Sequence, residues 1–141
     1  MKKIIYLALI VLISACTNST KEPEAPKPEN GLDAASKFLR AVLDGDYKTA
    51  RAYSVNDSTN KQTLDISEFK YNNEMPPDVK RAYKTASIRF PGEPRKINDS
   101  VTIIHYSNSH SNQLDSLKVI RTGGQWLIDL NFRFEQKDQI P

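Results

Sequence analysis

Cysteine is nearly absent from this 141-residue chain, which contains a single one, Cys16. One cysteine excludes an internal disulfide and the cysteine-rich zinc sites that stabilise many small domains. Histidine is also scarce, and His105 in a predicted strand and His110 in a polar turn do not make a metal site. The sequence lacks a phosphate-binding loop and a nucleophile elbow as well. We therefore expect no metal and no cofactor.

The sequence has no apolar run long enough to cross a bilayer, which takes about 20 residues in a helix. The run Ile4–Ile13 has ten residues. Lys2 and Lys3 precede it, and the small residues Ser14 and Ala15 follow it. That order is typical of a cleaved signal peptide and not of a transmembrane anchor.

The segment Ile13-Ser14-Ala15-Cys16 resembles the lipobox of bacterial lipoproteins, in which the signal peptide is cut before the cysteine and the cysteine is lipidated. The resemblance implies two or three acyl chains on Cys16 and durable membrane attachment, because each buried methylene contributes about 0.8 kcal/mol. The residue after Cys16 is Thr17 and not Asp. In Gram-negative lipoproteins this resemblance implies transfer to the outer membrane, and we expect the protein to face the periplasm. The alternative is an ordinary secretory signal with an incidental cysteine.

The chain carries no strong excess of either charge once the signal peptide is set aside. Without Lys2 and Lys3, the 20 Lys and Arg become 18, against 17 Asp and Glu, which gives a net charge of +1. A nucleic-acid-binding domain needs a basic face. We therefore expect no nucleic-acid partner.

The segment after Cys16 is predicted to be a flexible tether. Pro23, Pro26 and Pro28 stand among polar residues there, and no large apolar residue occurs. Such a segment cannot bury enough surface to offset its ordering entropy, and its prolines keep it semi-extended. We therefore divide the chain into a signal peptide (1–15), a lipidated tether (16–30), one folded domain (31–136) and a short tail (137–141).

The first helix of the domain is predicted over Leu32–Leu43. Gly45 follows as a stop, because glycine accepts the left-handed cap conformation, and Asp46 can cap a second helix over Tyr47–Tyr53. The apolar stripe of the first helix recurs at helical spacing in Ala35, Phe38, Leu39, Val42 and Leu43.

The central part of the chain is more polar, and its elements are predicted to be short. Ser54–Thr63 is expected to be a loop. Asp65–Glu68 fits the spacing of a capping box and predicts a short helix through Tyr71. Pro77 can occupy the first turn of another helix, which would run through Lys84.

The rest of the domain is predicted to be strands, because β-branched residues and turn signals alternate from residue 86 onward. The last strand has the clearest pattern, with Trp126, Ile128 and Leu130 on one face and Asp129 on the other. Helices followed by consecutive strands predict an α+β fold with an antiparallel sheet. The expected strands are Ser87–Phe90, Ser100–Tyr106, Leu114–Arg121 and Gln125–Phe134, the last two joined by the turn Thr122-Gly123-Gly124.

Two stretches of the chain carry a family resemblance. Residues 35–50 are similar to the helix, Gly-Asp-Tyr, Ala corner of nuclear-transport-factor-2-like domains, and residues 117–129 resemble their closing strand, Gly-x-Trp, strand hairpin. In particular, the chain resembles small lipoproteins related to lumazine-binding domains. The resemblance implies a cone, in which N-terminal helices pack into the concave face of a curved sheet, often around a pocket. Candidate pocket-lining residues are Phe38, Val42, Tyr53, His105 and Trp126.

Fold analogy alone does not establish an activity. We expect a membrane-anchored, non-catalytic binding domain that takes a small apolar ligand in the cone or an envelope protein on the open sheet face. A second hypothesis is an isomerase or dehydratase that uses His105 with a buried Asp or Tyr. A third is a structural module that forms a homodimer through its sheet. Asp129 is expected to face away from the core, solvated and paired with a neighbour.

Three serines follow an aspartate in the manner of the O-glycosylation acceptor sequence of Bacteroidetes. Ser58, Ser100 and Ser116 are the candidate acceptors. Asp-Ser pairs are also common in turns, where the aspartate bonds to the backbone. The pattern therefore remains open between a modification site and a turn signal.

Overall fold

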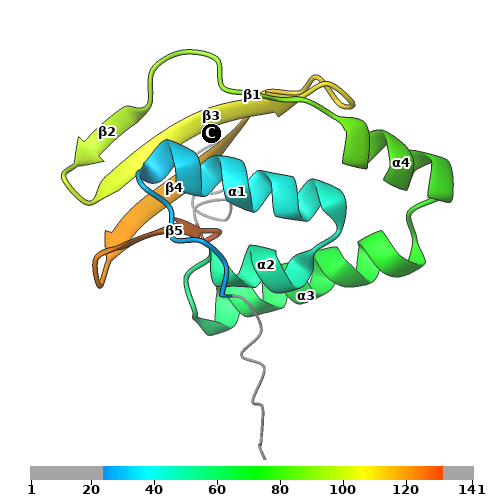
Figure 1. Cartoon of the computed structure of the whole chain (residues 1–141), viewed down its shortest axis with the longest axis horizontal. Coiled ribbons are helices and arrows are strands. Elements are labelled where there is room, and N and C mark those ends of the chain that lie inside the picture. Colours follow the sequence, from blue (N-terminus) through cyan, green and yellow to red (C-terminus); the bar gives the residue numbers. More distant parts are fainter. Residues whose placement is uncertain (1–23, 132–141) are drawn as a thin grey trace, which may run out of the picture.

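A computed structural model describes residues 24–131, which form four helices followed by a five-stranded sheet (Figure 1). The α+β class and the antiparallel sheet predicted from the sequence are confirmed. The elements are α1 (Gly31–Asp44), α2 (Tyr47–Ala52), α3 (Ser58–Asn73), α4 (Pro77–Thr85), β1 (Ile88–Arg89), β2 (Arg95–Asn98), β3 (Val101–Asn108), β4 (Asp115–Thr122) and β5 (Gln125–Asp129).

The sheet runs in the order β1-β3-β4-β5, and β2 also pairs with β3. β1 pairs with the end of β3 and β2 with its beginning, so these two short strands share β3 as their partner. In the central register Ile104 lies opposite Leu117 and Val119 lies opposite Ile128. These four side chains are buried, and they form the sheet's contribution to the core.

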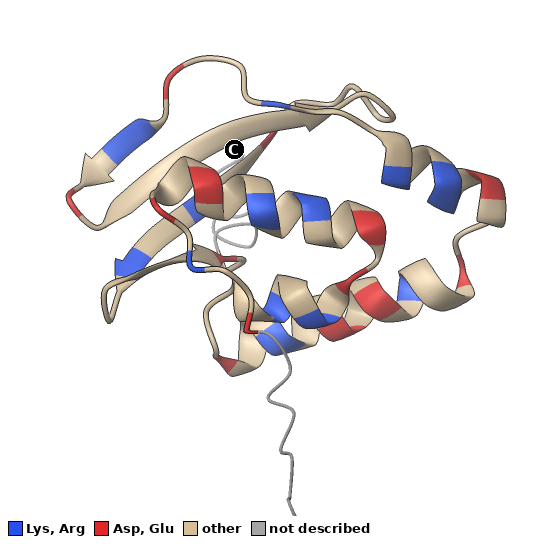
Figure 2. Ribbon diagram, viewed as in Figure 1, with Lys and Arg blue, Asp and Glu red and all other residues tan. Residues whose placement is uncertain are grey.

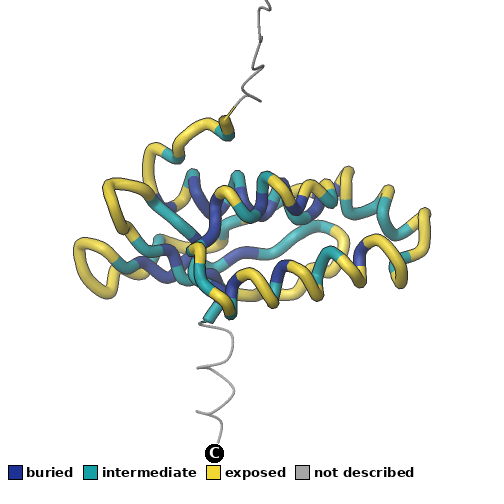
Figure 3. The backbone as a smooth tube through the Cα atoms, turned by 90° about the horizontal axis from the view of Figure 1, so that it is seen from below, coloured by how far each residue is buried: buried dark blue, intermediate teal, exposed yellow. Residues whose placement is uncertain are grey.

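The helix α1 lies along one face of the sheet, with an apolar side turned to the sheet and a charged side turned to solvent. Two basic residues lie between two acidic ones along the helix (Figure 2), and they pair one turn apart, with Lys37 Nζ 2.6 Å from Asp33 Oδ2 and Arg40 Nη2 2.9 Å from Asp44 Oδ1. Phe38 and the rest of the apolar stripe are turned inward. Figure 3 shows the buried residues gathered along the middle of the domain, with exposed turns at both ends.

The turn between α1 and α2 is the tight corner that the sequence predicted. Gly45 has φ of 76°, its amide donates to the Val42 carbonyl (3.1 Å), and the Asp46 amide donates to the Ala41 carbonyl (2.8 Å). This is the Schellman pattern of helix termination. The Asp46 side chain then accepts from the Thr49 amide at 3.0 Å and begins α2. Hydrogen bonds from the side chain and from the backbone amide of Thr49 lower the pKa of the Asp46 carboxyl.

The polar stretch expected to be a loop contains the beginning of α3, so the predicted loop over Ser54–Thr63 and the helix start at Asp65 are wrong. Asp57 is the true N-cap, because its Oδ1 accepts from the Asn60 amide at 2.8 Å. That hydrogen bond is the main cause of the lowered pKa of Asp57. The sequence shows no clear apolar periodicity here, because this 16-residue helix buries only Asn60, Leu64 and Tyr71.

Two predictions about the strands also need correction. The strand β2 was missed because all four of its residues are exposed and it shows no apolar alternation. The last strand ends at Asp129, earlier than predicted, and Leu130 and Asn131 form a turn. Residues 132–134 of the predicted strand lie outside the described residues.

The outer edge of β5 is paired with the chain that follows α2. The Ile128 amide donates to the Tyr53 carbonyl (2.8 Å), and the Val55 amide donates to the Ile128 carbonyl (2.9 Å). Ser54 thereby forms a parallel bridge with Ile128. This pairing satisfies backbone groups that an open sheet edge would leave free.

Candidate functional site

The structure distributes the candidate pocket residues over different parts of the domain. Phe38 packs within the core, while Val42 and Trp126 line two separate cavities near opposite ends of α1. Tyr53 lies beneath the segment that precedes α1, where its hydroxyl donates to the Pro26 carbonyl oxygen at 3.1 Å. Val42, Tyr53 and Trp126 therefore line different cavities.

His105 lies on the face of the sheet that is turned away from the helices. Its neighbours Ile104 and Tyr106 belong to the core, so the alternation of the strand directs His105 to the other side. The imidazole Nδ1 lies 2.8 Å from the hydroxyl oxygen of Ser116, its register partner on β4. The enzyme hypothesis requires this imidazole inside the helix-covered face, and it does not lie there.

Asp129 shares this second face and is paired, as expected. Lys118 Nζ lies 3.1 Å from Asp129 Oδ2, and the two residues are register partners. The expectation of a solvated carboxylate is wrong, because the Asp129 side chain is only 12% exposed. Opposite charges facing each other across strands stabilise a sheet, so a structural role accounts for this residue.

A cavity of about 240 Å³ lies between α1, α4 and the ends of β1 and β3. We call it the α4 cavity. Its wall is mainly aliphatic and aromatic, which is the usual composition of a small-molecule site. The lining residues are Leu39, Val42, Leu43, Tyr83, Ile88, Tyr106 and Asn108.

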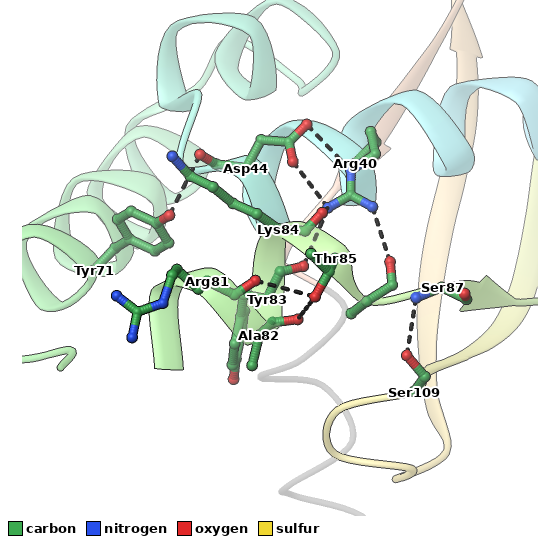
Figure 4. Close-up of polar contacts among 11 residues, drawn as sticks. Arg40, Asp44, Tyr71, Arg81, Ala82, Tyr83, Lys84, Thr85, Ser87 and Ser109 are labelled. Atoms are coloured by element: carbon green, nitrogen blue, oxygen red, sulfur yellow. Dashed lines mark hydrogen bonds and ion pairs between the residues drawn. The ribbon is translucent and has the colours of Figure 1, made fainter. Parts of the chain in front are cut away.

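The helix α4, which covers this cavity, is held to α1 by Arg40. The guanidinium donates to the carbonyl oxygens of Tyr83 (3.2 Å), Lys84 (3.1 Å) and Ala86 (2.9 Å), as Figure 4 shows. The last carbonyls of a helix have no partners within the helix, so Arg40 caps α4. No residue of α4 is fully buried. One side chain therefore fixes a lightly packed helix over an apolar cavity.

Tyr83 also connects α4 to the turn between β3 and β4. Its ring centroid lies 4.7 Å from that of His110. The turn itself is fixed by Asn108, whose Oδ1 accepts from the amides of His110 and Ser111, both at 3.0 Å. Tyr83 and Asn108 therefore place polar atoms at the edge of an otherwise apolar cavity.

Most of this site was not predicted from the sequence. Val42 was a candidate pocket residue, but Ile88 and Tyr106 were not, because they come from strands whose position against α4 has no local sequence signal. Arg40 carried one signal, its spacing of four residues from Asp44, which is typical of a helical ion pair. That spacing gives no indication of the carbonyls of α4.

Buried tyrosines lie on the helices at some distance from the α4 cavity. Burial raises the pKa of Tyr47 to about 12, and burial also raises the pKa of Tyr71. The two rings meet edge to face with centroids 6.0 Å apart. Both hydroxyls are therefore protonated at neutral pH, and the rings serve packing.

The three candidate glycosylation sites differ in exposure. Ser58 is the exposed first residue of α3, and Ser100 is exposed between β2 and β3. Ser116 is half-buried on β4 and bonded to His105. A glycan needs an accessible hydroxyl, so the structure offers Ser58 and Ser100 for this modification and not Ser116. Cys16, the predicted lipidation site, lies outside the described residues.

Comparison of the chain with protein-family models, with curated proteins and with solved structures finds no match. Among the helices of residues 24–131, none combines the length and apolar character that crossing a bilayer requires. The same residues contain no group of three or more His, Cys, Asp or Glu side chains able to hold a metal ion.

Proposed function

We propose that this chain is a lipid-anchored protein of the bacterial cell envelope whose folded domain binds a small apolar molecule in the α4 cavity. The signal-like segment and the lipobox-like residues before Cys16 support the anchor. The single observation that supports the ligand is the α4 cavity itself, an apolar space beneath a helix that buries no residue fully.

The size and cover of the cavity define the ligand. An apolar cavity of about 150 Å³ is enough for benzene, so a space of about 240 Å³ accepts one substituted ring or a short hydrocarbon chain. Elements with little buried surface open at low free-energy cost. Opening of α4 about the Arg40 contact would give such a molecule access.

The nuclear-transport-factor-2-like cone is the fold that we propose for the domain. Helices on one face of an antiparallel sheet, the Gly45 corner and the Gly123-Gly124 hairpin support it. The α4 cavity would then be what remains open of the cone, since Phe38 and its neighbours fill the rest. An envelope protein on the second sheet face, or a homodimer through that face, stays a prediction.

The anchor predicts a clear fractionation result. The full chain expressed in a Gram-negative host is expected to sediment with membranes and to need detergent for release. Cys16→Ser removes the acylated thiol and should lower the membrane-bound fraction by about tenfold or more, whereas Thr17→Ser should leave it unchanged. Retention of the Cys16→Ser protein on carbonate-washed membranes would contradict the anchor.

The proposed ligand site predicts that filling the cavity weakens binding. The neutral apolar probe propylbenzene, a single substituted ring of the size that the cavity accepts, should bind the wild-type protein, as measured by isothermal titration calorimetry. Val42→Phe adds a ring to the cavity wall, and we expect it to weaken probe binding by about tenfold. Ile66→Phe adds a similar ring at a position 49% exposed on α3 and should bind like the wild type.

Circular dichroism melting of each variant separates loss of binding from loss of folding. Equal probe binding by the wild type and a folded Val42→Phe protein would overturn the assignment to this cavity. The anchor and the ligand are tested independently, because Cys16 and Val42 lie in separate parts of the chain.

A further inference from the structure

We propose a second binding site, for a small monoanionic carboxylate with an apolar body, in the cavity at the N-terminal end of α1. This cavity has a volume of about 330 Å³, and we call it the α1 cavity. It is separate from the α4 cavity and differs from it in chemistry. The residues that matter are Gly31, Leu32, Lys96, Asp99, Thr102 and Trp126.

The first turn of α1 presents backbone donors to this cavity. Asn30 caps the helix, with its Oδ1 accepting from the Asp33 amide at 2.9 Å and its carbonyl accepting from Ala34 at 3.0 Å. The amides of Gly31 and Leu32 precede these bonds and have no acceptor among residues 24–131. Free amides at a helix N-terminus attract a negative charge.

Thr102 is the independent observation that points to a ligand. It lines the α1 cavity from β3 and is only 7% exposed. No side-chain hydrogen bond joins its hydroxyl to residues 24–131, and every fully enclosed side-chain polar atom among these residues has a partner, so the hydroxyl is not fully enclosed. The hydroxyl therefore keeps its remaining access through the cavity. A hydroxyl that can be reached from the cavity can donate a hydrogen bond to a ligand oxygen there.

The lining of the cavity holds one cationic and one anionic side chain, Lys96 and Asp99. Lys96 is the register partner of Thr102, so both residues lie on the helix-facing side of the sheet, and both line the cavity. Arg121 lies over the Trp126 ring, 5.7 Å from its centroid. Asp99 also lines the cavity. Lys96 and the partial positive charge at the N-terminus of α1, opposed by the one carboxylate of Asp99, favour a ligand with a single negative charge and disfavour a dianion.

Trp126 supplies the apolar surface of the site. Its ring packs close to the helix start, so that a methyl group added at Gly31 would lie 3.6 Å from Trp126 Cε3. Leu32 and Pro94 complete the apolar part of the lining. A flat apolar body against the indole, with its carboxylate directed to Lys96 and Thr102, satisfies both halves of the cavity.

The test follows ligand binding through the fluorescence of Trp126, which is the only tryptophan of the chain. The full chain is titrated with phenylacetate and with its neutral analogue phenylacetamide while tryptophan emission is recorded. We expect phenylacetate to bind about tenfold more tightly than the amide. Lys96→Gln and Thr102→Val should each reduce this preference to about threefold or less.

Two control variants separate this site from other effects. Lys61→Gln removes an exposed lysine from α3 and should keep the full preference. Val42→Phe alters only the α4 cavity and should leave phenylacetate binding unchanged, so failure of the proposed function does not affect this test. The inference is overturned if acid and amide bind equally, if Lys96→Gln behaves like the wild type, or if tryptophan emission does not change up to about 10 mM ligand.

Discussion

Gly45→Ala is expected to lower the free energy of unfolding by about 3 kcal/mol. Two costs combine at this position. A residue with a Cβ is strained at φ of 76°. The added methyl would also lie 2.9 Å from Tyr71 Oη and closer still to Cε1 and Cζ of that ring. The ring cannot move freely, because it packs against Tyr47 and beneath Lys80.

The chain offers a matched control for this substitution in Gly92. Its φ of 77° is nearly the same, but nothing lies within 4 Å of an added Cβ. Gly92→Ala should therefore cost about 1 kcal/mol, the conformational part alone. Urea unfolding of both variants, and of Gly45→Ala in a Tyr71→Leu background, measures the clash separately. Equal losses for Gly45→Ala and Gly92→Ala would show that the Tyr71 contact contributes nothing.

Asn60→Ala should cost a similar amount, about 3 kcal/mol, although it removes only a small polar side chain. Asn60 is fully buried, and its Oδ1 accepts from the Leu130 amide at 2.7 Å. Its Nδ2 donates to Asp57 Oδ2 at 2.8 Å. The alanine variant leaves a buried amide without an acceptor and weakens the cap of α3. Asn72→Ala, on an exposed side of the same helix, should change stability by about 0.5 kcal/mol or less.

Asn60→Asp tests the same contact through the pH dependence of stability. The new carboxylate would keep the bond from Leu130 but would face the carboxylate of Asp57. Burial and the like charge would raise the pKa of the new group in the folded protein. The folded state then binds more protons than the unfolded state, so stability should increase as the pH is lowered from about 7 to about 5. A pH-independent deficit would contradict this account.

The sequence predicts local features of this fold well because they depend on neighbouring residues. Gly45 and Asp46 are recognisable as a helix stop and a helix cap, since both roles are fulfilled within five residues. Asp57 has the same chemistry, but the polar residues after it resemble a loop, and α3 buries too few apolar side chains to show its period. The partner of Asn60 lies 70 residues away, and no local pattern can indicate it.

The candidate sites were less predictable for the same physical reason. Alternation places His105 with Ile103, but it does not say which face of the sheet the helices cover. Val42 on α1 and Trp126 on β5 both lie between the helices and the sheet, yet the length of α1 separates them into different cavities. The role of Lys96 depends on β2, a strand without one buried residue.

The pairing of Tyr53–Val55 with Ile128 has a consequence for folding during synthesis. Ribosomes release the helices first, yet α1 packs on β4 and β5, and the segment after α2 bonds to β5. The core therefore cannot close until nearly the whole domain has been synthesised, and these long-range contacts slow folding. A nascent chain that stays open in this way suits the export that we propose, because a translocation channel passes polypeptides in unfolded form.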